Sequence, residues 1–196
     1  MPPEEAASAG RRLARRALEL PELARARTVA AYVSVGREPG TRELLETLRA
    51  RGTAVLLPVL LADGDLDWAE YGGPDTLRPA GRGLLEPAGP RLGPAAVRAA
   101  EAVLLPGLAV DGRGLRLGRG GGSYDRVLAR LAGEGAPAGG GPAGGAPSDG
   151  VPAGGGPALV VLLYDGEVLD HVPAEPHDRP VTAAVTPSAV HRFPQP

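Results

Sequence analysis

The stretch that decides the fold is LLPGLAVDGRGLRLGRGGGSYDRVLARL, residues 104–131. It begins as an apolar run, passes through a polar turn and reaches a glycine-rich segment that contains Arg116 and Arg119. After Asp125 the apolar residues recur at helical spacing. A strand, a glycine loop and a helix start in this order predict a phosphate site. Backbone N–H groups of glycines can approach an anion closely, the helix N-terminus adds partial positive charge, and arginines supply matching donors.

Length and composition limit the class of protein. With 196 residues the chain is long enough for one α/β domain, which we expect to span residues 1–196. The formal net charge of -2 gives no basic field for nucleic acid, and there is no cysteine for a disulfide or a thiolate metal site. Neither a signal peptide nor an apolar run of membrane-spanning length is found. We therefore expect a cytoplasmic protein that binds neither nucleic acid nor a membrane.

A strand–helix–strand unit precedes the opening stretch. Residues 28–35 and 54–60 are β-branched and apolar, and Thr41 is the expected N-cap of a helix that continues to Ala50. A right-handed crossover of this kind places ligands beyond the carboxyl ends of the strands. Glu38 follows the first strand, so it is either a binding residue or a solvated loop carboxylate.

The remaining segments complete an α/β pattern. We expect an N-terminal helix over residues 4–20, an edge strand from Leu66 to Glu70 with Trp68 as a packing residue, and an ordered surface loop over residues 72–94. A short helix is expected at residues 94–100, and further strands at 158–164 and 181–186. Between them, at about 133–157, lies a Gly/Pro-rich insertion with almost no large apolar side chain, which favours a flexible surface segment. Four arginines of the N-terminal helix, Arg11, Arg12, Arg15 and Arg16, form either a phosphate contact or, more commonly, a solvated face.

Several chemistries lack support. Ser123 has no nucleophile-elbow motif, the histidines lack metal-site spacing, and neither standard nucleotide-binding motif is intact. A carboxylate directly after a phosphate loop suits Mg²⁺, which binds one or two carboxylates together with phosphate oxygens. Asp125 is therefore the first candidate for a metal ligand and Asp178 the second. The alternative for Asp125 is a first-turn acid that interacts with the helix dipole.

Taken together, these blocks resemble the 5-formyltetrahydrofolate cyclo-ligase family. The similarity lies in the opening stretch, in TVAAYVSVGREPGTRELLETLR at residues 28–49, in the strand at 54–60, in Leu-Glu-Pro at 85–87, and in VPAEPHD at 172–178 followed by Pro-Val. It covers nearly the whole chain outside the insertion. The resemblance implies an α/β three-layer domain with a mostly parallel sheet flanked by helices, of the NagB/RpiA/CoA-transferase-like type, and a monomer.

The resemblance also implies an activity and its residues. The expected reaction is the ATP- and Mg²⁺-dependent conversion of 5-formyltetrahydrofolate to 5,10-methenyltetrahydrofolate with release of ADP and phosphate, through a phosphorylated formyl oxygen that N10 then displaces. Catalysis is implied for Arg119 and Asp125, and Mg²⁺ binding for Asp125 and Asp178. The implied ATP contacts are Arg116, Leu117, Gly118, Arg119, Gly120, Gly121, Gly122, Ser123 and Tyr124. The implied folate contacts are Val33, Glu38, Arg119, Gly120, Gly121, Gly122 and Ser123.

Two departures from the family pattern bear on activity. The N-terminal segment resembles the family's second helix, so the first, basic helix that contacts ATP is expected to be absent. In the loop, Gly121 stands where some members have Lys, and Ser123 where Tyr is common. A catalytically weak relative that binds nucleotide or folate is therefore the first alternative. A phosphosugar isomerase of similar architecture is the second, although it would not explain Asp125 together with Asp178.

Overall fold

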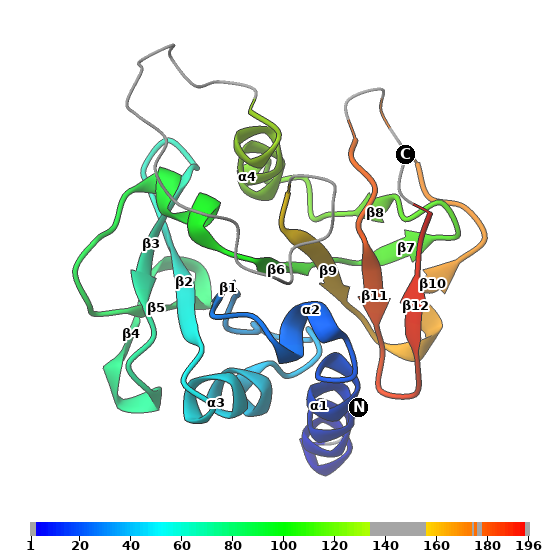
Figure 1. The fold of residues 1–196 in the computed structure, drawn as a ribbon, viewed down its shortest axis with the longest axis horizontal. Coiled ribbons are helices and arrows are strands. Elements are labelled where there is room, and N and C mark those ends of the chain that lie inside the picture. Colours follow the sequence, from blue (N-terminus) through cyan, green and yellow to red (C-terminus); the bar gives the residue numbers. More distant parts are fainter. Residues whose placement is uncertain (1–2, 134–155, 174, 176–177, 195–196) are drawn as a thin grey trace.

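A seven-stranded sheet forms the centre of the part of the chain that this computed structural model describes, residues 3–133, 156–173, 175 and 178–194 (Figure 1). The predicted insertion at 133–157 lies almost wholly outside these residues. In spatial order the strands are β12 (Val190–Arg192), β11 (Ala183–Val185), β9 (Ala158–Leu162), β6 (Ala102–Pro106), β1 (Thr28–Ala30), β2 (Ala54–Leu60) and β3 (Leu66–Glu70).

The sheet is parallel in its middle and antiparallel at both edges. β1 lies between β6 and β2, with Val29 opposite Ala102 on one side and Val55 on the other, and all three strands run the same way. β9 and β11 continue the parallel part, whereas β3 and β12 run against their neighbours. The carboxyl ends of β1, β2 and β6 consequently meet at one edge, which is the expected place for a ligand.

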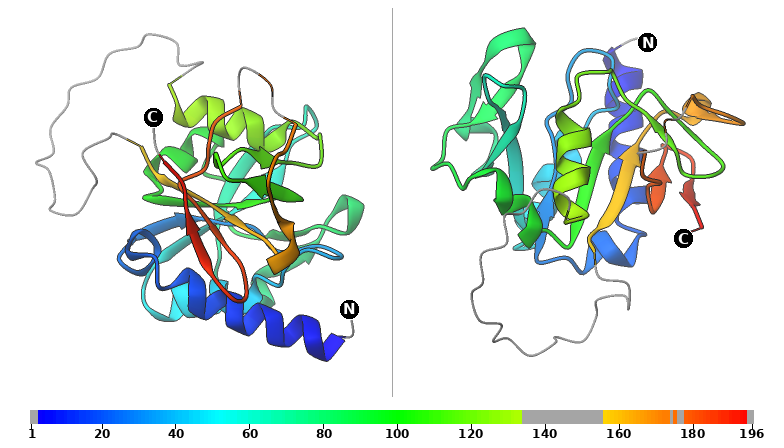
Figure 2. Two further views of the ribbon diagram at one scale, coloured as in Figure 1. Left: turned by 90° about the vertical axis from the view of Figure 1, so that its right-hand side faces the viewer. Right: turned by 90° about the horizontal axis from the view of Figure 1, so that it is seen from above.

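Helices cover both faces of the sheet (Figures 1 and 2). α1 (Pro3–Ala17), α2 (Pro21–Ala24) and α3 (Arg42–Ala50) pack on one face, and α4 (Ser123–Leu131) and a 3₁₀ helix (Pro94–Ala99) pack on the other. Alternating strand residues serve the two cores, since Leu104 belongs to the first and Leu105 to the second. The predicted three-layer α/β fold with a mostly parallel sheet is confirmed.

Smaller elements carry the loops that approach the ligand edge. A three-stranded sheet joins β10 (Val168–Leu169), β7 (Ala109–Asp111) and β8 (Arg116–Leu117). The predicted surface loop contains a hairpin of β4 (Leu77–Pro79) and β5 (Leu85–Pro87), whose tip is a 3₁₀ turn at Gly81–Gly83. Two further 3₁₀ turns are Pro74–Thr76 and Asp165–Glu167.

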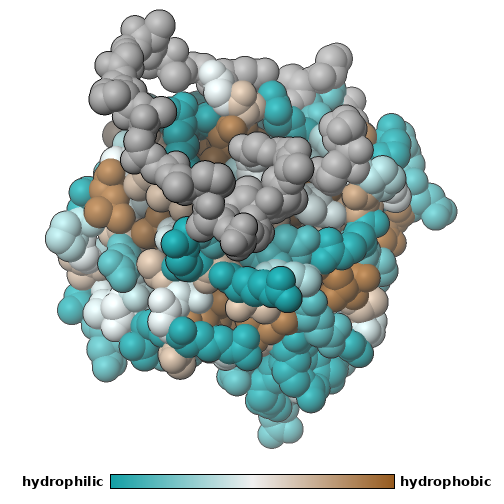
Figure 3. Space-filling view, in the orientation of Figure 1, coloured by the Kyte–Doolittle hydropathy of each residue, from teal (hydrophilic) through white to brown (hydrophobic). Residues whose placement is uncertain are grey.

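The surface agrees with this layering. Figure 3 shows hydrophilic side chains over the outer face of α1, at the bottom of the view, while Leu13 and Ala17 on its inner face are buried. Trp68 is fully buried, as expected for a packing residue. Within the described part of the chain, we find no helix that combines the length and the apolar character needed to cross a membrane.

Three local predictions were wrong in detail. Residues 31–35 are not strand but leave the sheet as a loop, in which Tyr32 and Val33 remain buried. The apolar run that opens at Leu104 is divided between β6 and β7 at Gly107, where a Cβ would lie 2.7 Å from Cγ2 of Val161. The antiparallel edge strand β12 was not predicted.

Thr41 occupies the N-cap position of α3 but does not cap it with its side chain. Its hydroxyl donates to the carbonyl of Tyr32 at 2.9 Å and accepts the N–H of Ser34 at 2.9 Å. The residue therefore connects the loop after β1 to the start of α3. Its hydroxyl supplies hydrogen-bond partners to two backbone groups of that loop, which would cost free energy if they were buried without a partner.

Candidate functional site

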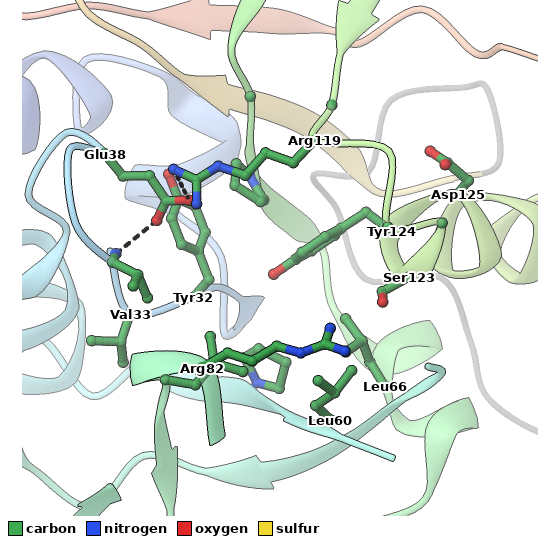
Figure 4. Close-up of a pocket in the computed structure, with 18 of the residues that line it drawn as sticks. Tyr32, Val33, Glu38, Leu60, Leu66, Arg82, Arg119, Ser123, Tyr124 and Asp125 are labelled. Atoms are coloured by element: carbon green, nitrogen blue, oxygen red, sulfur yellow. Dashed lines mark hydrogen bonds and ion pairs between the residues drawn. The ribbon is translucent and has the colours of Figure 1, made fainter. Parts of the chain in front are cut away.

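A pocket of about 320 Å³ lies at the ligand edge of the sheet (Figure 4). Its walls come from the loop after β1, the ends of β2 and β6, the start of β3, the β4–β5 hairpin, and the segment from β8 into α4. The lining residues are Tyr32, Val33, Val35, Glu38, Pro58, Leu60, Leu66, Arg82, Leu84, Leu85, Glu86, Pro106, Gly107, Arg116, Gly118, Arg119, Gly120, Gly121, Gly122, Ser123, Tyr124 and Asp125.

The glycine loop, residues 118–122, is open toward this pocket. Gly120 and Gly122 have φ of 77° and 70°, a left-handed conformation that glycine adopts without strain. A Cβ added at Gly120, Gly121 or Gly122 would meet no atom within 4 Å, so nothing in the described chain fills the space beside the backbone. α4 starts directly afterwards at Ser123, and the partial positive charge of its N-terminus acts at the same place.

Arg116 is held rigidly beneath the loop. Its side chain is 7% exposed, Nη1 donates to the carbonyl of Pro106 at 3.0 Å, and Nη2 donates to Oδ1 of Asp125 at 3.1 Å. Burial lowers the pKa of Arg116, and the nearby charges of Asp125 and Asp178 partly oppose this. Its buried Nε has no hydrogen-bond partner in the described chain. Gly118 makes room for this guanidinium, since a Cβ there would lie 2.8 Å from Nη1.

Arg119 and Glu38 join the two sides of the pocket. Nη2 of Arg119 lies 3.3 Å from Oε1 of Glu38, and the backbone N–H of Val35 donates to the other carboxylate oxygen at 2.7 Å (Figure 4). The Glu38 side chain is 10% exposed. Of the two interpretations of Glu38, the solvated loop carboxylate is therefore wrong, and the residue belongs to the pocket wall.

Two tyrosines border this ion pair. The hydroxyl of Tyr32 is buried and has no hydrogen-bond partner within the described residues. Burial and then the charge of Glu38 raise the pKa of both Tyr32 and Tyr124. Both hydroxyls therefore keep their protons at neutral pH and present donors rather than charges.

Both ends of α4 are attached to the turn between β2 and β3. The hydroxyl of Ser123 donates to the carbonyl of Gly64 at 2.7 Å, and Nη2 of Arg130 lies 2.6 Å from Oδ2 of Asp65. Because the Ser123 hydroxyl proton is used in this contact, a ligand in the pocket would meet the backbone N–H of this residue or a lone pair of its oxygen.

The two predicted metal ligands lie on different segments. Asp125 has a side chain that is 53% exposed and pairs with Arg116. Asp178 accepts the N–H of Glu175 at 2.7 Å, and its charge reaches Arg116. Within the described ranges no group of three or more His, Cys, Asp or Glu side chains could hold a metal ion. Asp178 and Leu117 are not among the lining residues, and neither are the four arginines of α1.

The buried carboxylate of Asp111 stabilises the turn that leads toward the glycine loop. Asp111, at the end of β7, is fully buried and binds Arg113 through Oδ2 at 2.6 and 2.9 Å. It also accepts the backbone N–H groups of Arg113, Leu115 and Val172. Burial would raise the pKa of Asp111, but these hydrogen bonds lower it below its usual range. The carboxylate thus fixes the turn that leads into β8.

Sequence reasoning missed much of the pocket wall. The apolar residues Pro58, Leu60, Leu66 and Leu84, here called the leucine wall, gave no signal beyond their strands and loop. Arg82 did give a signal, since it stands alone between two glycines, Gly81 and Gly83, but the sequence prediction did not include it. Its φ of 62° is the only positive value at a non-glycine residue in the described ranges.

Comparisons of the sequence with known proteins find similarity to proteins of one name. A family model described as the 5-formyltetrahydrofolate cyclo-ligase family matches residues 1–139. The 5-formyltetrahydrofolate cyclo-ligase of Mycolicibacterium smegmatis is 40% identical over 166 residues, which is 82% of this chain and 74% of that protein. The protein of the same name from Escherichia coli K12 is 29% identical over 191 residues, 96% of this chain and 93% of its own.

Solved structures show the same fold. The NMR structure of Aquifex aeolicus 5,10-methenyltetrahydrofolate synthetase matches with a TM-score of 0.74 and 23% identity, over 100% of this chain and 87% of that one. A 5,10-methenyltetrahydrofolate synthetase from Mycoplasma pneumoniae matches with a TM-score of 0.62 and 15% identity, over 95% and 90%.

Proposed function

The chain belongs to the 5-formyltetrahydrofolate cyclo-ligase family, and we propose that it converts 5-formyltetrahydrofolate to 5,10-methenyltetrahydrofolate while ATP is hydrolysed to ADP and phosphate. The observation that carries the proposal is the position of the pocket. Every lining residue falls between Tyr32 and Asp125, inside the segment that the family model matches. The alternative of a phosphosugar isomerase has no support from these comparisons.

ATP fits one side of the pocket. The open face of the glycine loop, the N-terminus of α4 and the orphaned Nε of Arg116 together form a set of donors for phosphate oxygens. We propose that the segment from Arg116 to Tyr124 binds the phosphate chain. Leu117 would contribute through its backbone, since it does not line the pocket.

The described carboxylates are too few to hold Mg²⁺ alone, so the ion would bind together with nucleotide phosphates. Asp125 and Asp178 are two carboxylates near Arg116, and Mg²⁺ in such sites takes one or two carboxylates and completes its shell with phosphate oxygens and water. When bound, the ion would neutralise phosphate charge during transfer. We propose that Asp125 is its principal protein ligand and that Asp178 is a further one.

The folate would occupy the other side. The Glu38 carboxylate can accept N–H groups of a pterin, and Val33 and the leucine wall offer apolar contacts to flat rings. In the structure one oxygen of Glu38 forms an ion pair with Arg119. We propose that the pterin replaces Arg119 at this oxygen, which leaves the guanidinium of Arg119 available to the reacting groups.

The chemistry then requires positioning more than proton transfer. We propose that the formyl oxygen attacks the γ-phosphorus as the bond to ADP breaks. N10 next attacks the formyl carbon and loses its proton to solvent, and the C–O bond breaks to release phosphate. Arg119 would stabilise the anionic oxygens in both steps, and the backbone N–H groups of Gly120, Gly121 and Gly122 would hold the phosphate in line.

We infer that residues 1–196 act as one domain. The two ends of the described chain are connected, because Arg192 in β12 binds both carboxylate oxygens of Glu22 in α2 at 2.7 and 3.0 Å. The monomeric state and the cytoplasmic location remain predictions from the sequence.

The test is the ATP-dependent appearance of methenyltetrahydrofolate absorbance with purified protein. Omission of ATP and addition of EDTA are the controls, and both should abolish the signal. Binding of ATP or folate without turnover would instead favour the catalytically weak relative. A signal that persists without ATP would contradict the proposed reaction.

A further inference from the structure

Arg82 enters the pocket from the tip of the β4–β5 hairpin, on the wall that faces the glycine loop. In Figure 4 its side chain runs beside Leu60 and Leu66 and extends toward the end of the pocket where Ser123 lies. The methylene stem thus covers apolar surface while the guanidinium stays in the open space.

The charge of Arg82 has no counterpart within the described chain. Arg116 pairs with Asp125 and Arg119 pairs with Glu38, whereas no hydrogen bond or ion pair joins Arg82 to any described residue. Glu86, the remaining acid of the pocket, accepts the N–H of Leu60 at 3.0 Å. Arg82 is therefore the one arginine of this pocket whose five donors are all available.

The backbone at this position is strained. Arg82 has φ 62° and ψ 22°, a left-handed conformation that disfavours side chains and favours glycine. The residues on both sides, Gly81 and Gly83, are glycines, and a third glycine at position 82 would adopt this backbone conformation with less strain. Residues held in such conformations concentrate at ligand sites, where the side chain has a use that offsets the strain.

On these grounds we propose that Arg82 binds an anionic group of the bound reactants from the wall opposite the glycine loop. The proposal rests on the proposed function, which supplies two such groups. One is a carboxylate of the glutamyl part of 5-formyltetrahydrofolate, and the other is a phosphate of ATP. Both present the paired anionic oxygens that a planar guanidinium recognises.

Equilibrium binding to the full chain separates the two sources. The probes are a non-hydrolysable ATP analogue, 5-formyltetrahydrofolate, and 5-formyltetrahydropteroate capped as its N-methylamide, which keeps the amide of the folate and lacks every carboxylate. Arg82→Gln is expected to weaken one ligand about tenfold, the size of one partly screened charge-assisted contact. Loss for 5-formyltetrahydrofolate but not for the capped pteroate identifies the carboxylate, and loss for the ATP analogue identifies the phosphate.

Two further variants make the result specific. Arg91→Gln removes an exposed arginine of the same segment that does not line the pocket, and it should change no affinity. Arg82→Gly should weaken binding as Arg82→Gln does while its melting temperature equals or exceeds that of the wild type, because the strained backbone is relieved. The wild-type affinity should also depend more steeply on salt than that of Arg82→Gln.

Unchanged affinity for all three ligands in Arg82→Gln would overturn the proposal, and so would an equal loss in Arg91→Gln. A wild-type protein that binds the ligands but forms no product would contradict the proposed function alone. The two ideas therefore fail in different measurements.

Discussion

Replacement of Asp111 by Asn should destabilise the protein by about 3 kcal/mol. Oδ1 of Asp111 accepts backbone N–H groups of Arg113 and Leu115, while Oδ2 accepts Nε and Nη2 of Arg113 and the N–H of Val172. An Asn that keeps its oxygen toward the first pair turns an NH₂ group toward three donors. It also removes the negative charge from a fully buried position.

The expected loss of stability follows from the hydrogen-bond and ion-pair partners that the substitution of Asp111 leaves behind. Loss of one partner from a buried ion pair costs about 3–5 kcal/mol. The lower end applies here, because the Arg113 side chain is 54% exposed and can regain water. For a protein of this length about 1 kcal/mol corresponds to about 2–4 °C, so the melting temperature should fall by about 6–12 °C.

Thermal and urea unfolding, followed by circular dichroism, measure this change. Asp170→Asn is the matched control, since Asp170 is exposed on the neighbouring segment after β10, and it should melt as the wild type does. A shift below about 2 °C in Asp111→Asn would show that the turn before β8 does not depend on the charge and would refute the reasoning.

Three further substitutions test the site and its support. Gly118→Ala places a Cβ 2.8 Å from Nη1 of Arg116, so the Michaelis constant for ATP should rise about tenfold or more, and an unchanged constant would mean that Arg116 can move without consequence. Asp125→Ala should abolish turnover yet leave far-UV circular dichroism unchanged, because the carboxylate is 53% exposed; normal turnover would return Asp125 to a role in the helix dipole. Asp65→Ala should cost about 1 kcal/mol at neutral pH through loss of the contact with Arg130. Burial acts to raise the pKa of Asp65, but Arg130 and a backbone N–H lower it overall. The unfolded carboxyl thus binds protons more readily, and the contribution is complete above about pH 4 and is lost as the pH falls through the lower folded pKa. A difference in urea midpoint that stays constant down to about pH 2 would contradict this assignment.

The parts of the fold that could be predicted are those where burial imposes a simple pattern. Strand β2 is buried on both faces and its residues form an apolar run, so its limits at Ala54 and Leu60 were predicted correctly. The edge strand from Leu66 to Glu70 was predicted from alternation. Thr41 shows the limit, because its hydroxyl binds the loop after β1, a partner that local sequence does not specify.

The candidate site likewise has one part that could be predicted from the sequence and another that could not. The glycine loop and Glu38 could be predicted, since glycines, arginines and a strand-end acid are signals within short segments. The leucine wall could not, because its residues become a wall only when the β4–β5 hairpin and the strand end at Leu60 meet the loop in space. An apolar strand residue that lines a pocket looks the same in sequence as one that fills the core.

The assembly of this pocket from segments that are far apart in the sequence has a consequence for the protein in the cell. No stretch of the unfolded chain brings Glu38, the leucine wall and the glycine loop together, so ligands of the pocket bind the native state alone. At a ligand concentration of 100 times the dissociation constant, such binding adds about 2.7 kcal/mol to the free energy of unfolding. The lifetime of the protein against proteolysis therefore depends on the supply of the molecules that it binds, and depletion of those molecules lowers its abundance as well as its activity.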